Sequence, residues 1–502
     1  NIATKGITSV TLGTSNFVAG STAGDSIVSG GNYNTLIGDE AGTAITTGTH
    51  NVALGFSALD ANTTGSGNHA IGTSSLTNNT TGANNTSVGS GSLASNTTAS
   101  SNTAVGYTAL LANTTGTQNT AIGTQAMAVN TTGANNVALG FLAMLNGTTA
   151  SDNIAVGVNA LYTNTTGTSN TALGRSALRY NTTASNNTAV GYNSLLANTT
   201  GAANTAVGAG CLDANTTGND NVAVGRLALE FNTTADDNVA IGFIAMRYNT
   251  TGTYNTAVGR NALGANTTAA NNTAVGWGSL SANTTAADNT ALGTQALTSN
   301  TTGANNTGIG RSALLVNTTG ASNVSLGSNS LRSNTTANSN TAIGTNTLYA
   351  NTTGAENVAI GQGALSANTT ASYNVAVGRN ALDLNTTGAN NIAVGSFALD
   401  ANTTGGDNSA LGDRALSANT TGAQNVAVGR KALQANTTGA SNTALGNYSL
   451  FSNTTADYNT AVGRSALEAN TTGANNTAVG FQASNDNTTG TQNVAVGYQA
   501  FT

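Results

Sequence analysis

The chain has little of what most enzymes and binding domains use. It contains no proline, one cysteine and two histidines among 502 residues, and only 6% of its residues are charged. A single cysteine excludes a disulfide framework within the chain and a metal site built from cysteines. The 13 lysines and arginines are scattered and form no basic patch for nucleic acid, and no apolar run approaches the ~18 residues that span a membrane. We therefore expect no nucleic-acid partner and no membrane-spanning segment.

The few residues that could carry chemistry do not converge in the sequence. His50 and His69 fall in adjacent repeats with no carboxylate at matching positions, so we expect two surface imidazoles and no metal site. Cys211 stands where alanine or serine is usual, which predicts a small core side chain. Asp236 and Asp237 are neighbours in the chain, so strand alternation points them apart. The sequence predicts a protein that is not an enzyme and uses no cofactor.

A repeat of 17 residues organises the sequence. Asn-Thr-Thr recurs at this spacing to Asn487 without an insertion or deletion. When each unit starts at its first asparagine, 28 units begin between Asn34 and Asn493, and we number their positions 1 to 17. Position 5 is glycine in every unit, and only Ile45 and Gly147 replace the asparagine of position 12.

This short period predicts a parallel β-solenoid. A helical pair needs about 33 residues per repeat, and asparagine, threonine and glycine are weak helix formers. Segments such as 102–106, bounded by asparagine and glycine, are typical of strands with tight corners. We therefore predict an all-β fold, a parallel β-solenoid (β-roll) with one coil per unit. At ~4.8 Å per coil, the 28 coils would extend over roughly 130 Å.

Recurring side chains predict ladders along the stack. Branched aliphatic residues at position 4, such as Val105, and leucine at position 9, such as Leu110, are expected to stack in the core. Asparagine can hydrogen-bond along such a stack, and it recurs at positions 1 and 12, as in Asn102 and Asn113. The invariant Gly106 at position 5 predicts a corner with positive φ or a very close backbone approach.

Threonine, glycine and the variable residues complete the repeat. Thr114 and Thr115, at positions 13 and 14, suit a pleated surface, and alternation would place one rank on each face. Position 15 is glycine or alanine, which indicates tight packing without a requirement for positive φ. The charges of the regular units occupy positions 6, 7, 10, 11, 16 and 17, so these positions are expected to face water.

Position 3 is almost always alanine and points away from position 4 if this segment is a strand. A solvated face would be free to vary, so uniformly small residues indicate that something packs there. Two large aliphatic side chains per coil contribute roughly 1.5–3 kcal/mol each, whereas ordering the backbone costs about 1–2 kcal/mol per residue. We expect a homo-oligomer, most simply a trimer. The alternative is a flattened single-chain roll whose two sheets pack their small faces together.

Residues 1–33 do not fit the register and are interpreted as an irregular N-terminal cap or junction, before a solenoid over 34–502. Solenoid ends need such atypical segments to prevent edge pairing. No comparable cap follows the last unit, so the first segment could also stack on the open end of another molecule. The candidate residues of this assembly end are Ile7, Val10, Leu12, Phe17 and Val18.

The unit Asn102-Thr-Ala-Val-Gly-Tyr-Thr-Ala-Leu-Leu-Ala-Asn-Thr-Thr-Gly116 resembles two groups of proteins. One is the head repeats of trimeric autotransporter adhesins, with their A-[IV]-G-x-x-A pattern. The other is the Asn-Thr-Thr-Gly repeat regions of phage tail-fibre-like and bacterial surface proteins. The resemblance covers residues 34–502 and implies a trimeric β-roll that projects from a cell or virion. The 17-residue period is longer than the usual adhesin head repeat.

These observations predict a structural fibre module, which is an adhesin-like or tail-fibre-like shaft. The shaft would stand at a cell or virion surface and present variable side chains. A receptor or a glycan is expected as a further partner. The first alternative is a subunit that polymerises end to end through residues 1–33. A minor alternative is a threonine ladder that binds ice or glycan. Each Asn-Thr-Thr is also a formal N-glycosylation acceptor, although an internal asparagine ladder is favoured because glycans every ~4.8 Å would crowd.

Overall fold

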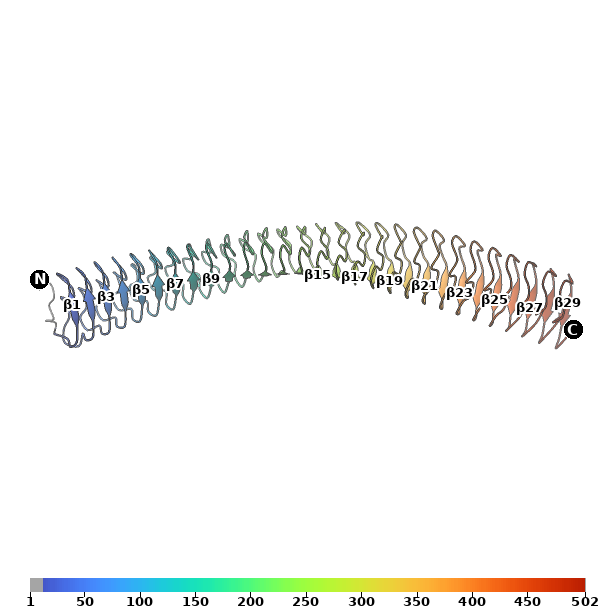
Figure 1. Ribbon diagram of the computed structural model, residues 1–502, viewed down its shortest axis with the longest axis horizontal. Helices are drawn as coiled ribbons and strands as arrows, with labels where there is room; N and C mark the ends of the chain where they lie inside the picture. The colour runs from blue at the N-terminus through green and yellow to red at the C-terminus, as the bar shows by residue number, and fades with distance from the viewer. Residues whose placement is uncertain (1–11, 502) are drawn as a thin grey trace, which may run out of the picture. The chain divides into compact units, whose positions relative to one another are not determined.

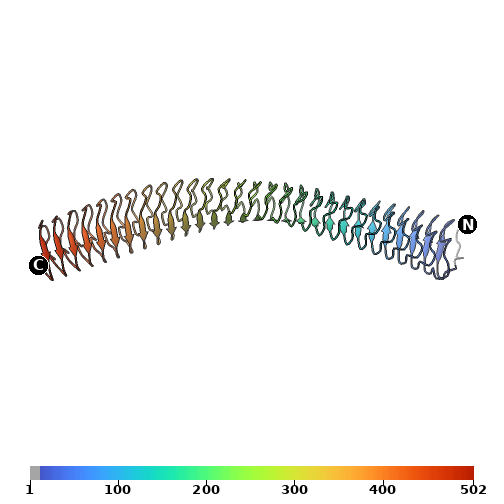
Figure 2. The same ribbon diagram turned by 180° about the vertical axis from the view of Figure 1, so that it is seen from behind.

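The structure, a computed structural model, describes residues 12–501. The chain divides into two units, Asn1–Thr253 and Tyr254–Thr502, and each is treated by itself. The described residues contain strands, turns and bends but no helix, and thus no helix that could cross a membrane. In both units consecutive strands pair side by side in chain order, along one side of the coils (Figure 1), and Figure 2 shows the same order from behind. The predicted all-β parallel β-solenoid is confirmed.

Every strand has three residues and covers positions 2 to 4 of its coil. The strands of the first unit are β1 Phe17–Ala19, β2 Thr35–Ile37, β3 Val52–Leu54, β4 His69–Ile71, β5 Thr86–Val88, β6 Thr103–Val105, β7 Thr120–Ile122, β8 Val137–Leu139, β9 Ile154–Val156, β10 Thr171–Leu173, β11 Thr188–Val190, β12 Thr205–Val207, β13 Val222–Val224 and β14 Val239–Ile241. Those of the second unit are β15 Thr256–Val258, β16 Thr273–Val275, β17 Thr290–Leu292, β18 Thr307–Ile309, β19 Val324–Leu326, β20 Thr341–Ile343, β21 Val358–Ile360, β22 Val375–Val377, β23 Ile392–Val394, β24 Ser409–Leu411, β25 Val426–Val428, β26 Thr443–Leu445, β27 Thr460–Val462, β28 Thr477–Val479 and β29 Val494–Val496.

The register of the sheet equals the sequence period. Strands β6 and β7 pair parallel, with Val105 opposite Ile122, 17 residues later. At the start of the first unit the offset is 18, because Phe17 pairs with Thr35. Asn16 nevertheless acts as a position-1 residue, since its Oδ1 accepts the backbone N–H of Asn34 at 2.8 Å. Residues 16–20, within the segment 1–33 that was interpreted as irregular, therefore belong to a coil of the stack.

Tight turns follow each strand. In the coil that begins at Asn102, the N–H of Ala109 donates to the carbonyl of Gly106, and the N–H of Asn113 donates to that of Leu110, both at 3.3 Å. Gly106 has φ 137°, and a Cβ there would lie 2.5 Å from the carbonyl oxygen of Gly123 in the next coil. Both reasons given for the invariant glycine are confirmed, because this φ is accessible to glycine alone and no space exists for a side chain.

The core contradicts the predicted assignment of positions 3 and 4. Ala104 at position 3 is fully buried with Ala109 and Leu110, whereas Val105 is half-exposed on the outer side of the strand. The position-4 side chains do stack coil on coil, but outside the core. Leu110 fills the interior from the opposite wall, so only a methyl group fits beneath the strand.

The irregular first coils show that positions 3 and 9 share one space. Leu36 occupies position 3 where alanine is usual, and Gly42 occupies position 9 where leucine is usual. A Cβ on Gly42 would lie 3.0 Å from a methyl carbon of Leu36. In the second unit, a Cβ on Gly308 at position 3 would lie 3.3 Å from Leu297 at position 9. The alanine of position 3 is therefore small because a leucine lies against it. The face expected to pack on a partner is the interior of the coil.

Candidate interaction surfaces

Two asparagine ladders hold the coils together from within. Asn113 donates from Nδ2 to the Oδ1 of Asn96 at 2.9 Å and to the carbonyl of Gly116 at 3.0 Å. Asn102 donates to the same carbonyl at 2.9 Å, and its Oδ1 accepts the backbone N–H of Asn119 at 2.9 Å. Because both side chains are buried and bonded, they add order without the cost of an unpaired polar group. The predicted ladders at positions 1 and 12 are confirmed.

The coil that begins at Asn136 shows what the ladder requires. Here Gly147 replaces the asparagine of position 12, so no side-chain amide reaches back to Asn130. The Oδ1 of Asn130 is buried without a hydrogen-bond partner. Asn164, one coil later, keeps its bond to the carbonyl of Gly167 at 2.9 Å. Asn164 has no asparagine in the preceding coil to which its Nδ2 could donate, so the gap interrupts the ladder on both sides. The defect is confined to these neighbouring coils because each coil bonds only to its neighbours.

The Asn-Thr-Thr segment is used internally. The hydroxyl of Thr114 donates to the carbonyl of Thr131 at 3.0 Å, whereas Thr115 is exposed and its hydroxyl has no partner among the described residues. Only Thr115 therefore belongs to an exposed rank of threonines, which agrees with the expectation of one rank on each face. The amide nitrogen of Asn113, which glycosylation would modify, donates two hydrogen bonds inside the coil. In the folded chain this nitrogen is therefore part of the internal ladder that the sequence favoured.

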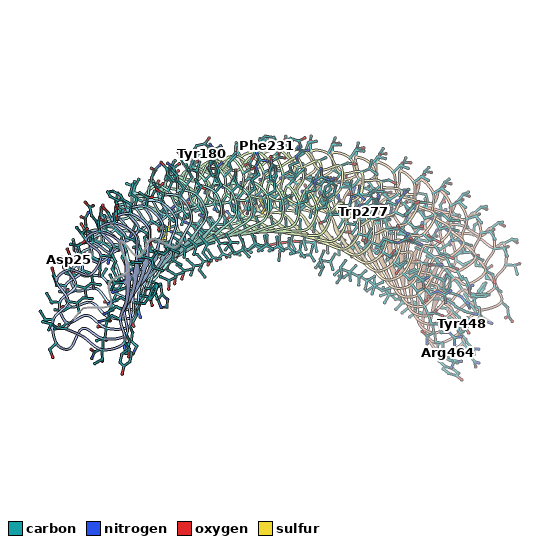
Figure 3. All side chains as sticks on the ribbon, turned by 60° about the vertical axis from the view of Figure 1, so that its left-hand side comes forward. Asp25, Tyr180, Phe231, Trp277, Tyr448 and Arg464 are labelled. Carbon is teal, nitrogen blue, oxygen red and sulfur yellow. The ribbon has the colours of Figure 1, made fainter. Side chains whose placement is uncertain are left out.

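The outer side of the strands is an apolar face, which we call the strand face and define as positions 2 and 4 of every coil. Position 4 is valine, isoleucine or leucine in all units, and position 2 is threonine, valine or isoleucine apart from His69 and Ser409. Leu139 is 44% exposed, Ile154 41% and Leu173 41%. In Figure 3 these side chains form a row of short sticks along the strands. No charged residue occurs at either position.

The turns of the coils carry isolated polar and aromatic contacts at positions 6, 7, 10 and 11, which we call the turn face. Phe231 and Tyr248 stack with ring centroids 5.5 Å apart. Arg247 lies over both rings and pairs with Glu230. Tyr180 and Phe231 project from the coils on the side away from the strands (Figure 3). Such contacts are local, and no coil repeats the set of its neighbour.

The isolated reactive residues form no site. His50 and His69 are exposed, and His50 stacks on Tyr33 at 4.9 Å. No group of three or more histidine, cysteine, aspartate or glutamate side chains that could hold a metal occurs in residues 12–501. Cys211 is buried, as predicted, and donates to the carbonyl of Gly208. Burial raises the pKa of its thiol to about 11, so thiolate chemistry is disfavoured at neutral pH.

The two remaining predictions concern acidic residues and the N-terminal segment. Asp236 accepts the backbone N–H of Asn219, whereas Asp237 is exposed, so the two carboxylates do not form a pair. In the N-terminal segment, Val18 is buried in β1, while Leu12 and Phe17 are exposed. Ile7 and Val10 lie outside the described residues. End-to-end assembly through these residues stays a prediction.

No protein family and no curated protein matches this chain. The resemblance to adhesin and tail-fibre repeats therefore stays a prediction. The strand face was missed because large aliphatic residues at position 4 were assigned to the core. A signal was present: Leu36 at position 3 coincides with Gly42 at position 9, which indicates that these two positions, and not position 4, compete for the interior.

Proposed function

We propose that the chain is a structural fibre module, a shaft outside a cell or virion that spans distance. The observation that carries this proposal is the identity of the bonds between successive coils. The ladders of positions 1, 12 and 13 repeat in both units, as in Asn113, Asn351 and Thr352. A stack of equal coils has a length proportional to their number, and such extended repeats suit a spacer.

The remaining parts of the proposal follow from the sequence. Variable residues at the turn face, such as Tyr180 and Arg247, would be presented to the surroundings and could contact a receptor or glycan. The resemblance of the repeat to adhesin and tail-fibre regions supports a cell or virion surface and a homo-oligomer, with a trimer as its simplest form. The shaft acts by its dimensions and needs no catalytic centre.

A deletion of whole coils tests the shaft. Removing residues 102–169, which are four coils, joins Ser101 to Asn170 in register. We expect the shortened chain to fold and its particles in negative-stain images to be shorter by roughly 19 Å, at ~4.8 Å per coil. Removing 102–161 joins position 17 to position 10 and serves as the out-of-register control, which should unfold locally. An in-register deletion that leaves the particle length unchanged would contradict the proposal.

A further inference from the structure

The strand face is too apolar and too uniform for a surface that meets only water. Single exposed aliphatic side chains are ordinary, but a continuous apolar patch beyond roughly 300–600 Å² marks an interaction surface. At about 25 cal/mol per Å² and 1.5–3 kcal/mol per buried aliphatic side chain, one such side chain corresponds to roughly 100 Å². With roughly a third of it exposed, the aliphatic rank of position 4 over at least thirteen strands presents roughly 400 Å² in each unit, to which the valines and isoleucines of position 2 add.

Forces within the chain do not explain the residues of position 4. A preference for β-branched residues would admit threonine, which is common at position 2 on the same face, yet position 4 never contains threonine. Leucine is not β-branched but occurs at Leu54, Leu139 and Leu173. Stacking between coils is also insufficient, because position 6 stacks in the same way and contains arginine, aromatic and small residues. The shared property of position 4 is its aliphatic character at a half-exposed site.

We propose that the strand face is the interface through which copies of this chain associate side by side. Any partner that follows this face must repeat its contacts every ~4.8 Å, and a second copy has that repeat by construction. Two sheets pack about 10 Å apart with their side chains interdigitated, which suits ranks of valine, isoleucine and leucine. The aliphatic area of the two units together matches the roughly 800 Å² per partner of a stable interface. The absence of charge at positions 2 and 4 leaves no repulsion between like chains.

This inference rests on the proposed fibre module and names the surface of its self-association. The small residues of position 3 were the reason given from the sequence for a homo-oligomer, and the strand face now takes their place. The small residues of position 3 are interior, as Ala104 shows, so they cannot form the contact between chains. The aliphatic residues of position 4, on the outer side of the same strand, can form this contact.

Lysine substitutions on alternate coils test the interface in the full chain. The strand-face variant carries lysine at position 4 of four coils: Val105→Lys, Leu139→Lys, Leu173→Lys and Val207→Lys. The control carries the same charge at the exposed position 14 of those coils: Thr115→Lys, Thr149→Lys, Thr183→Lys and Thr217→Lys. We expect the wild type and the control to have the mass of two or three chains in light scattering, and the strand-face variant to have the mass of one. Circular dichroism must show that both variants retain the wild-type spectrum.

A cross-linking experiment keeps the test valid if the lysine variant does not fold. In a Cys211→Ala background, Val105→Cys should form disulfide-linked chains under mild oxidation, whereas Thr115→Cys should not. A monomeric wild type, a strand-face variant that folds and keeps the wild-type mass, or equal cross-linking of the two cysteines would each overturn the interface. None of these results affects the shaft, because the particle length after coil deletion tests the shaft independently.

Discussion

Within each coil, positions 12 to 15 and the turn-face positions 6, 7, 10 and 11 differ in what their side chains contact. Asn113 bonds to the equivalent asparagine one coil away, and Thr114 bonds to the equivalent carbonyl. Arg247, on the turn face, contacts an unlike set of neighbours that no other coil reproduces. Positions that contact their own equivalents are uniform because a change in one coil leaves a partner in the next coil unsatisfied. Positions with local contacts vary. Position 4 is uniform and yet faces outward, and this exception is the reason why we propose a partner outside the chain.

Substitution of the corner glycine should have the largest effect. Gly106→Ala forces a side chain into φ 137° and against the carbonyl of Gly123, so we expect a loss of about 3 kcal/mol in the free energy of unfolding. Gly308→Ala is the matched control, because alanine is usual at its position 3, its φ is not positive, and a Cβ there would lie 3.3 Å from the flexible side chain of Leu297. Urea unfolding followed by circular dichroism measures both. Similar losses in the two variants would show that the corner is not special.

The asparagine ladder should have the next largest effect. Asn113→Ala removes the bonds to Asn96 and Gly116 and leaves the buried Oδ1 of Asn96 without a donor, which should cost about 2–3 kcal/mol. Thr115→Ala, on the exposed rank, should change the free energy of unfolding by less than about 0.5 kcal/mol. Amide hydrogen exchange would place the loss in the coils next to Asn113. Protection that is unchanged there would contradict the role of the ladder.

Repair of the natural gap should stabilise the chain. Gly147→Asn would supply the amide missing beside the Oδ1 of Asn130 and should add about 1 kcal/mol. The new Cβ would lie 3.0 Å from the terminal methyl of Met144, a flexible side chain that can move. Gly147→Ala adds the carbon without the amide and should not reproduce the gain. Equal midpoints of thermal unfolding for the two variants would refute the explanation.

Substitution of Asp213, at the variable position 10, should have the smallest effect on the free energy of unfolding, and this effect should depend on pH. Burial, and then the charge of Glu230, raise the pKa of Asp213 above its ordinary value. A carboxyl whose pKa is raised by folding stabilises the fold at low pH, and this contribution is lost as pH rises through the folded pKa. Asp213→Asn should therefore be more stable than the wild type at neutral pH, by less than about 0.5 kcal/mol, and should lose this advantage in acid. A wild type that is the more stable protein at neutral pH would contradict the sign.

The period of the repeat was sufficient to predict the solenoid, its ladders and its glycine corner, because each depends on residues that meet their own equivalents. The inward and outward sides of the strand were assigned wrongly, because alternation defines two faces without saying which is inside. Size was used to decide, and Val105 is larger than Ala104. The interior is instead filled by Leu110 from across the coil.

The positive φ of Leu110, which is 55°, could also not be predicted from the sequence. Leucine has no preference for the left-handed region, where a non-glycine residue is disfavoured by about 1–2 kcal/mol. Its burial in the narrow interior offsets this cost in each coil. In contrast, positions 7 and 17 also have positive φ and often contain asparagine, aspartate, serine or glycine, so their composition was a usable signal of turn geometry.

The exchange of identical bonds between neighbouring coils has a consequence for inheritance. Any two coils that carry both asparagines can bond to each other, so a recombination event that duplicates or removes whole repeats in the gene leaves the ladders between such coils continuous. An insertion or deletion that is not a multiple of 17 residues would instead misalign both asparagine ladders at once. Populations carrying this gene should therefore differ in repeat number by whole coils, with fibre length as the heritable trait.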